Sequence, residues 1–495
     1  MVLDDRVFPL TRRQFEIWLA HETGGPDANL HLGELLRIDG EVDPELVEWS
    51  IRHVVYEAEP LRTVFFQEDD QVFQKLVEYP NVELLRFDLA NSEDPTQEVH
   101  RLASSIRRAP MPLSGPLFKF ALMQTRANEN YLFACCHHIA VDGIGLGLVL
   151  HRIAAVYSAA AANQEVPPSF FGSLQDLIQS ELEYQASSDF LDDQDYWIRN
   201  LPAERPPAHP VAPGEAAGSA GDEFSAPFPL ESQVVGQIDQ FARNLGVRRS
   251  SVITAACALL VSKYDVEHSE IVLDFPVSRR VRPESQMVPG MISGVVPLVL
   301  KTSADSSVAD FCRHVNTRIG EALQHQRFPV HTLENRARLR NSGPASSRVV
   351  VNFIPAAHMG YFDDALATGT LTNAGFGDQA ALVFFRDGDQ LFLSTLGAGE
   401  PFADFGVADL AERLSRLLLA MTAGPERQLV SVDLLAEREH AELNSWGNRA
   451  VLTGSGSVSV SIPGVFAGQV ARSPEAVALR WAGRSWTYRE VDEAP

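Results

Sequence analysis

Tyr131-Leu-Phe-Ala-Cys-Cys-His-His-Ile-Ala-Val-Asp-Gly-Ile-Gly-Leu-Gly-Leu-Val-Leu150 is the stretch around which the rest of the sequence is organised. Its apolar, aromatic-rich start predicts a buried strand, and Asp142-Gly143 predicts a turn that opens a buried helix. His137 and His138 therefore stand where the strand ends. Because neighbouring strand residues point to opposite faces, only one of the two histidines can face a given cleft, while the other packs elsewhere.

The residues of this predicted turn have the chemistry of an active site. A histidine titrates near neutrality, so one that is aimed into a tunnel can take a proton from an amine or a hydroxyl, or stabilise developing charge. Asp142 can hold an imidazole tautomer or pair with an arginine, and the N–H of Gly143 can face a developing oxyanion. A His-His pair alone is more often packing, and Asp-Gly alone is a turn. The strand before, the helix after and four such residues in register favour an active site.

Length and composition limit the class of protein. The 495 residues suffice for two or three domains, and 45% hydrophobic with 21% charged residues is ordinary for a globular chain. The formal net charge of −24 argues against a nucleic-acid or membrane partner. The N-terminus lacks a signal-peptide pattern and no run is expected to span a membrane, which predicts a cytoplasmic protein. The cysteines lack metal-binding spacing and are expected to be reduced core residues: Cys135, Cys136, Cys257 and Cys312.

At this point the turn carries a family resemblance. His137-His138-Ile-Ala-Val-Asp142-Gly143 matches the HHxxxDG signature of the chloramphenicol-acetyltransferase-like acyltransferases. These include the condensation domains of non-ribosomal peptide synthetases, epimerisation domains, wax-ester synthases and polyketide-associated acyltransferases. The signature does not choose among them, so the rest of the chain has to decide.

Two stretches before the signature resemble motifs of condensation domains. Thr11 to His21 predicts a capped helix with the glutamine and tryptophan spacing of the first motif. Glu59 to Phe66 resembles the second motif, whose arginine, here Arg62, is structural in the family. Glu57-Ala58 stand where that motif usually has arginine and histidine, which is a departure from the pattern.

Stretches after the signature extend the resemblance. Ser278-Arg-Arg280 ends a predicted core strand, and the resemblance implies that Arg280 forms a salt bridge with Asp142 and holds the signature loop. Arg279 replaces the glycine that is usual there. Pro289 to Leu300 resembles condensation domains that accept an aryl or fatty acyl cap, as in siderophore and lipopeptide-initiating synthetases. The resemblance also gives candidates for residues of the substrate tunnel: Ser293, His325 and Asn352.

The C-terminal end distinguishes among the families. Residues 437–450 resemble the linker between condensation and adenylation domains, and 465–490 resemble the opening helix, strand and motif of an adenylation domain. The resemblance implies an α/β (α+β) fold with two chloramphenicol-acetyltransferase-like lobes in a V-shaped pseudodimer with a central tunnel. The expected divisions are an N-terminal lobe at 1–175, a C-terminal lobe at 176–445, a linker at 446–462 and a truncated adenylation start at 463–495.

The resemblance implies an acyltransferase that forms an amide between a carrier-bound acyl donor, which can be aryl or fatty acyl, and a carrier-bound aminoacyl acceptor. His138 is the expected catalytic residue, as a base or by positioning the amine, and Gly143 flanks the reacting carbonyl. His137, Asp142, Arg280 and Arg62 are expected to be structural.

The same resemblance predicts the partners. No metal and no bound cofactor is expected, because the substrates arrive on 4'-phosphopantetheine arms of carrier domains. The expected partners are a donor acyl- or aryl-carrier protein in trans, the peptidyl carrier protein of the chain's own module, and an adenylation domain in cis.

Alternatives remain at this stage. A stand-alone acyltransferase of the acyl-coenzyme-A or wax-ester type and an epimerisation domain are made less favourable by the adenylation-like end. A heterocyclising domain would have aspartate in place of His137. A condensation-like module that only docks partner enzymes is disfavoured by the intact signature.

Overall fold

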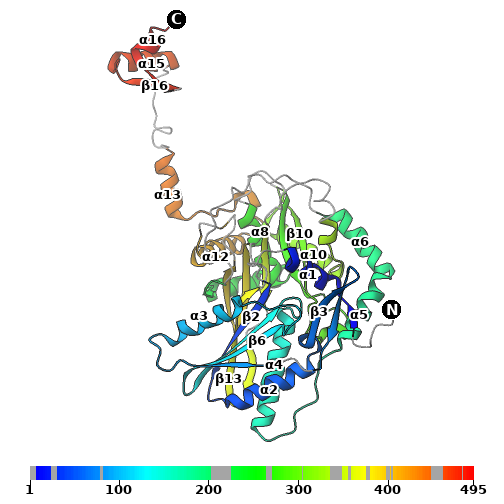
Figure 1. Ribbon diagram of the computed structural model, residues 1–495. Helices are drawn as coiled ribbons and strands as arrows, with labels where there is room; N and C mark the ends of the chain where they lie inside the picture. Colours follow the sequence, from blue (N-terminus) through cyan, green and yellow to red (C-terminus); the bar gives the residue numbers. More distant parts are fainter. Residues whose placement is uncertain are drawn as a thin grey trace. The chain divides into compact units, whose positions relative to one another are not determined.

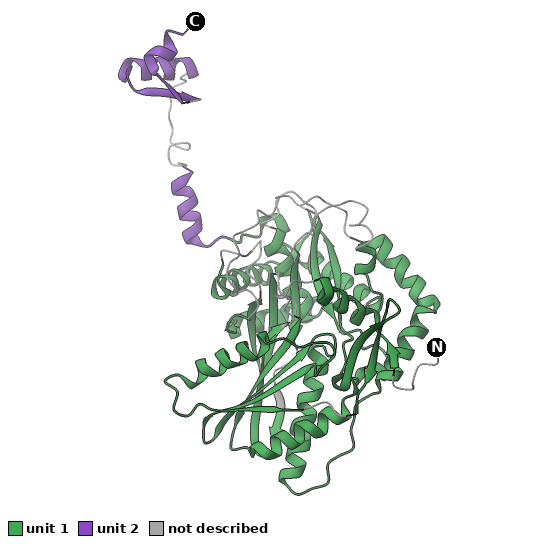
Figure 2. Ribbon diagram, viewed as in Figure 1, with its two compact units in different colours: residues 1–434 green, residues 435–495 purple. Residues whose placement is uncertain are grey.

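The structure is a computed structural model of the chain. It describes residues 7–23, 30–78, 82–201, 224–262, 270–303, 305–334, 348–354, 358–374, 380–396, 402, 405–447, 461–481 and 483–494. The chain divides into two compact units, residues 1–434 and 435–495 (Figure 2). Each unit is described by itself below.

The first lobe of unit 1 is built on a six-stranded sheet in the order β12-β13-β2-β7-β6-β5. Its strands are β2 (His31–Asp39), β5 (Leu84–Asp88), β6 (Phe118–Arg126), β7 (Glu129–His137), β12 (His358–Phe362) and β13 (Ala365–Ala374). Strand β6 pairs antiparallel with β7, and β7 ends on His137 as expected.

The two faces of this sheet pack against different helices, as the two-residue period of a strand requires. Leu36, Leu132 and Ala134 face a core with helices α2 (Pro44–Glu57) and α4 (Gly143–Ala161). Leu35 and Phe133 face the other side, which α3 (Pro95–Arg108) covers. The signature turn therefore connects the central strand β7 to a helix that packs back on the same sheet.

Two strands of the first lobe come from the second half of the sequence. β13 pairs antiparallel with β2, from Leu366 opposite Asp39 to Ala374 opposite Leu32, and β12 pairs with β13 (Figure 1). The expected boundary between the lobes at residue 175 does not account for these two strands, which follow it in the sequence but belong to the first-lobe sheet. The reason is physical: β2 would otherwise be an edge strand with unpaired backbone groups, and β13 covers that edge.

The second lobe has its own six-stranded sheet, in the order β10-β9-β11-β14-β15-β8. The strands are β8 (Phe228–Pro229), β9 (Glu270–Val277), β10 (Gly294–Lys301), β11 (Val349–Ile354), β14 (Ala381–Asp387) and β15 (Gln390–Leu396). They pack with α7 (Ser232–Leu245), α8 (Arg249–Ser262), α10 (Val308–Gln324) and α12 (Val407–Ala423).

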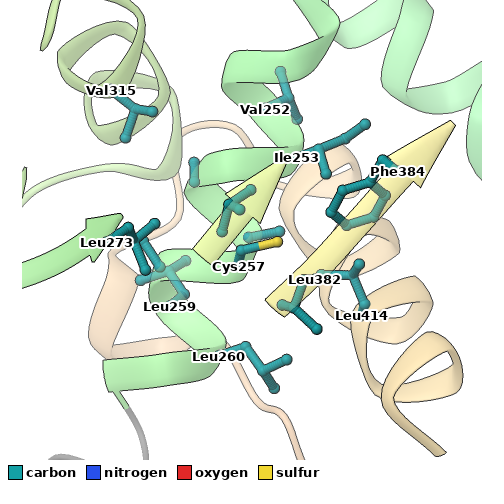
Figure 3. Close-up of a cluster of buried hydrophobic side chains, with 14 of the residues drawn as sticks. Val252, Ile253, Cys257, Leu259, Leu260, Leu273, Val315, Leu382, Phe384 and Leu414 are labelled. Atoms are coloured by element: carbon teal, nitrogen blue, oxygen red, sulfur yellow. The ribbon is translucent and has the colours of Figure 1, made fainter. Parts of the chain in front are cut away.

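Helix α8 lies in the centre of this second core. Figure 3 shows its Cys257 in one cluster with Leu382 of β14 and Leu414 of α12. The sequence of α8 has almost no polar face and predicts this burial. The predicted role of the cysteines is confirmed as well, because all of them are free and buried: Cys135, Cys136, Cys257 and Cys312.

Unit 1 contains further elements outside these two six-stranded sheets. Three strands, β1 (Val7–Pro9), β3 (Thr63–Glu68) and β4 (Gln71–Leu76), form a sheet in the order β1-β4-β3. The helical segments are α1 (Arg12–Thr23), η1 (Glu59–Arg62), α5 (Leu174–Gln185), α6 (Ser188–Asn200), α9 (Pro283–Gln286) and η3 (Leu429–Ser431).

Unit 2 contains α13 (Glu437–Trp446), α15 (Ile462–Arg472), the β16 (Val477–Trp481) and β17 (Arg484–Thr487) hairpin, and α16 (Tyr488–Asp492). This helix, strand pair and short helix follow the order expected of an adenylation-domain start. Most of the expected linker, residues 448–460, lies outside the described residues.

Helix α4 corrects the expectation that no run has the length of a membrane span. By length and composition, Gly143–Ala161 is long and apolar enough to cross a membrane. Helices α7 and α8 reach that length and apolar character only when taken together, and the pair is bent by 108°. Half of the α4 window is buried inside the protein, however. Its apolar residues, such as Leu146, Val149 and Ile153, are part of the first-lobe core. A core helix of this kind needs no bilayer to cover it.

Glu34 is an acidic residue on the α2 and α4 face of the first sheet. It is 6% exposed, and burial raises the pKa of its carboxyl to about 7. The folded state therefore holds the proton more tightly than the unfolded chain, so the contribution of Glu34 to stability is complete below pH 4.5 and is lost as the pH rises through about 7.

We expect Glu34→Gln to remove this loss. Between pH 5.5 and 8 the free energy of unfolding of the wild type should fall by on the order of 2 kcal/mol relative to the variant. Urea unfolding of both proteins at the two pH values measures the difference. The exposed Glu41→Gln is the matched control. An equal pH dependence in wild type and Glu34→Gln would contradict the assignment.

Candidate active site

His138 lies immediately after β7, and the backbone of the turn fixes it. Its N–H donates to Leu30 O at 2.7 Å, and its Nδ1 lies 3.0 Å from Val141 O. A carbonyl only accepts, so Nδ1 carries the ring proton and the lone pair of the neutral imidazole is on Nε2. Burial, with the nearby charge of Arg13, lowers the pKa of His138 to about 4. The ring is therefore neutral at pH 7, with Nε2 as the basic nitrogen.

His137 points to other neighbours, as strand geometry requires. Its Nδ1 accepts the N–H of Ile139 at 3.1 Å, and its Nε2 lies 3.4 Å from Nδ1 of His21. The ring of His31 packs edge-on against it at 5.5 Å. Burial lowers the pKa of His137 to about 2, so this ring is also neutral. The expected division of the two histidines is thus seen in the geometry, with His137 packed in a cluster of rings.

Asp142 pairs with an arginine, which decides between the two roles left open by the sequence. Its Oδ2 lies 2.7 Å from Nη1 of Arg280 and its Oδ1 2.8 Å from Nη2. It also accepts backbone N–H groups from Gly145, Ile292 and Ser293 at 2.8, 3.1 and 2.8 Å. Burial would raise the pKa of this carboxyl, but Arg280 and the backbone donors hold it below the usual value. The pair expected between Asp142 and Arg280 is present.

This carboxylate joins the signature turn of the first lobe to a loop of the second. Asp142 is the N-cap of α4, and the loop that donates to it leads into β10. Arg280 donates to Gly290 O in the same loop at 3.1 Å. Five donors on one buried carboxylate leave little freedom of position, so the turn that carries His138 is held from both lobes.

Glycines allow the close approach of this loop. A Cβ on Gly145 would lie 3.0 Å from the carbonyl carbon of Pro289 and 3.1 Å from Gly290 O, so a side chain there would push the loop away. Around Gly143 a Cβ would meet nothing within 4 Å. The lack of space for a side chain therefore requires glycine at position 145 and not at position 143. The sequence interpretation missed Gly145, although its place in Gly-Ile-Gly-Leu-Gly was a signal.

Of the tunnel candidates, only Ser293 lies beside the signature turn, through its N–H bond to Asp142. His325 ends α10 and binds Asp193 of α6 at 2.6 Å, with its ring stacked on Tyr196. Asn352 lies in the middle of β11, opposite Val383. The contacts described for His325 and Asn352 therefore do not link either residue to the signature residues, and their place in a tunnel stays a prediction.

Arg62 has the structural position that was expected. Its Nη1 donates to Val77 O at 3.2 Å and its guanidinium lies over the ring of Tyr56. These contacts join η1 and the end of α2 to the segment that follows β4. Within the described residues no group of three or more His, Cys, Asp or Glu side chains is placed to hold a metal.

Helix α1 contributes residues that sequence reasoning did not assign to the site. Gln14 donates to Ile139 O in the signature turn at 3.3 Å, which explains a glutamine in this helix. Arg13 forms an ion pair with Glu16 at 3.0 Å, and Glu16 in turn binds His331. These residues lie more than a hundred positions from the signature, and no local pattern linked them to it.

Comparison with known proteins places this geometry in a family. The sequence matches the condensation domain family over residues 4–444. The chain belongs to the condensation domain family. Condensation domains are acyltransferases that form amide bonds in non-ribosomal peptide synthesis, and the chloramphenicol-acetyltransferase-like fold expected from the signature is theirs.

Solved structures agree on the fold of this condensation domain. The first condensation domain of the calcium-dependent antibiotic synthetase in complex with a substrate analogue has a TM-score of 0.76 at 24% identity, covering 88% of this chain and 100% of that chain. The starter condensation domain of rhizomide synthetase, solved as a mutant in complex with C8-CoA, has a TM-score of 0.73 at 26% identity, covering 87% and 98%.

Curated relatives are much longer than this chain. An isonitrile lipopeptide synthase of Streptomyces coeruleorubidus is 28% identical over 98% of the chain, which covers 32% of that protein. Enterobactin synthase component F of Escherichia coli O157:H7 is 24% identical over 98% of the chain and 37% of its own length. The dimodular nonribosomal peptide synthase of Bacillus subtilis is 25% identical, with 20% of its length covered. The chain spans about two fifths or less of these relatives.

The structure accounts for both departures from condensation-domain motifs. Glu57 receives two hydrogen bonds of 2.8 Å from Arg152 of α4, so its carboxylate is compensated inside the lobe. Arg279 has a φ of 54°, the left-handed conformation that the usual glycine adopts easily. Its guanidinium occupies the space beside Gly294, where a Cβ would clash with the guanidinium carbon. Arg279 and Gly294 therefore fit together.

Proposed function

We propose that this condensation domain transfers an aryl or fatty acyl group from a donor carrier to the amine of an aminoacyl group on an acceptor carrier. The observation that carries the proposal is the orientation of His138, whose Nδ1 proton is held by Val141 O, which places the lone pair of the neutral imidazole on Nε2. The likeness to starter condensation domains, one of them in complex with C8-CoA, supports an acyl donor.

The proposed step forms one C–N bond and breaks one C–S bond. The neutral amine of the acceptor attacks the carbonyl carbon of the donor thioester. The proton that the amine loses passes to Nε2 of His138, and from there to the departing thiolate. The products are an amide on the acceptor arm and a free thiol on the donor arm, so no net proton is gained or lost.

The enzyme's main contribution beyond this proton transfer is placement. Holding both thioester arms end to end can lower the barrier by ~7–11 kcal/mol, more than a general base supplies. The double attachment of Asp142 to Arg280 and to the 290–293 loop keeps the signature turn rigid enough for such placement. We assign Asp142 and Arg280 this positioning role.

The proposed partners follow from the carrier-bound substrates. A donor acyl- or aryl-carrier protein delivers the first thioester in trans, and the peptidyl carrier protein of the same module delivers the second. The 4'-phosphopantetheine arms belong to these carriers, and the domain itself holds no cofactor. Unit 2 would continue into an adenylation domain in cis. We place the reaction in the cytoplasm, where carriers and aminoacyl thioesters are made.

Single-turnover amide formation, followed by mass spectrometry, tests the proposal. Donor carriers loaded with 2,3-dihydroxybenzoyl, octanoyl or aminoacyl groups are mixed with aminoacyl-loaded acceptor carriers and the full chain. We expect amide from the aryl or octanoyl donor and little from the aminoacyl donor. Product only from aminoacyl donors would overturn the acyl-cap assignment, and no product from any donor, with carrier binding intact, would identify a docking module.

A further inference from the structure

A cavity of about 70 Å³ lies where the N-terminal end of α1, helix α5 and the segment after β9 meet. Its lining is unusually basic for a chain of net charge −24. The charged residues that line it are Arg12, Arg13, Arg279, Arg282, Arg327 and a single carboxylate, Glu181. We call it the arginine cavity.

Neutral groups hold the central guanidiniums in place. Arg279 donates from Nε to Gln326 O at 2.9 Å and from Nη2 to Phe328 O at 3.3 Å. Arg327 donates to Ser180 O and lies over the ring of Tyr184 at 4.0 Å. Carbonyl oxygens and an aromatic ring orient a guanidinium without cancelling its charge.

Carboxylates near the arginine cavity offset only part of this charge, because one carboxylate faces five guanidiniums in the lining. Within the described part of the chain, no carboxylate oxygen lies within 4 Å of the guanidinium nitrogens of Arg279, Arg282 or Arg327. Glu181 accepts the backbone N–H of Arg12 at 2.9 Å, and Glu16 is paired with Arg13 and His331. Burial and the neighbouring Arg13 lower the pKa of Arg279 to about 10, although Glu16 and Glu181 act in the opposite direction, so the group stays cationic at pH 7 and would gain from a further anion.

The position of the cavity relates it to the reacting groups. Ile292 lines the cavity and also donates its N–H to Asp142, and Arg279 is adjacent in sequence to Arg280. Arg13 is close enough to His138 for its charge to lower the pKa of that imidazole. The cavity is therefore next to the signature turn. The phosphate of a pantetheine arm, in contrast, lies the whole length of the arm away from the thioester.

We propose that the arginine cavity binds a carboxylate carried by one of the two substrates close to its thioester, and that Arg279 provides this specificity. The inference rests on the proposed function. A guanidinium presents paired donors that match a carboxylate, and a cavity of this size admits such a group. A glycine in place of Arg279 would leave the same space without the charge.

Ligand binding to the full chain carrying His138→Ala tests the inference without turnover. Isothermal titration compares aspartyl-pantetheine with alanyl-pantetheine, neither of which has a phosphate, and with alanyl-4'-phosphopantetheine. We expect the aspartyl ligand to bind about tenfold or more tightly than the alanyl ligand, the fold-change typical of a charge-assisted hydrogen bond. In Arg279→Gly this ratio should fall to about one, and Arg279→Lys should keep part of it.

Two further comparisons keep the test decisive. Arg282→Ala, at an exposed side chain that lines the cavity, should reduce the ratio in a protein whose folding is not in question. Equal binding of aspartyl and alanyl ligands by the protein with Arg279 intact would overturn the inference. So would an Arg279→Gly effect confined to the phosphate-bearing ligand, which would assign the cavity to the arm. Selective binding together with failure of amide formation in the wild type would instead remove only the proposed function.

Discussion

Replacing His138 with alanine is expected to slow single-turnover amide formation by about 10²–10⁴-fold, the usual contribution of a positioned general base. The reason is the loss of Nε2, whose lone pair is set by the bond between Nδ1 and Val141 O. His138→Asn is the sharper variant, because its amide can still donate to Val141 O but has no nitrogen in the place of Nε2. Both variants should lose the single-turnover rate to the same extent.

The control is another histidine on the element that follows. His151 is exposed on α4, and His151→Ala should leave the rate unchanged. Retention of more than a third of the rate in both His138 variants would mean that the imidazole does not act in the chemical step. NMR of ¹⁵N-labelled histidine adds a direct check: with a pKa lowered to about 4, the His138 ring should remain neutral from pH 8 down to pH 5.5.

The signature turn could be predicted from the sequence because its determinants are local. The apolar run of β7, the Asp142 cap and the apolar helix α4 are contiguous, and the bond that orients His138 reaches only to Val141. Strand geometry then separates the two histidines without further information. Helix α8 was predictable for the same reason, since a segment with almost no polar face has to be buried.

Other features depend on contacts that no local pattern reveals. The pairing of β13 with β2 joins strands that are more than 300 residues apart in the sequence. The alternation of apolar residues in a strand does not predict which other strand it pairs with. Arg280 was placed through a family resemblance, whereas its neighbour Arg279 was recognised only as a departure. The contact of His325 with Asp193 of α6 is of the same kind, because the sequence does not indicate this partner, and the place of His325 in the tunnel stays a prediction.

Breaking the ion pair of Asp142 with Arg280 is expected to have the largest effect on stability. Both side chains are buried, at 0% and 5% exposure, so either single replacement leaves a charge without its partner. Asp142→Ala should lower the free energy of unfolding by about 3–5 kcal/mol. Urea unfolding followed by tryptophan fluorescence measures it, and a loss below about 1 kcal/mol would contradict the pairing.

Stability and catalysis can then be separated with a second ion pair of the same lobe. Arg152 of α4 and Glu57 of α2 form a less deeply buried pair, with side chains 2% and 15% exposed. Arg152→Ala should therefore cost stability too, by less than Asp142→Ala, while the folded protein keeps its rate. In contrast, Asp142→Leu combined with Arg280→Met should recover much of the stability, because apolar groups can replace a buried pair, yet remain slow since the 290–293 loop has lost its acceptor. A double variant with full activity would show that Asp142 acts only through folding.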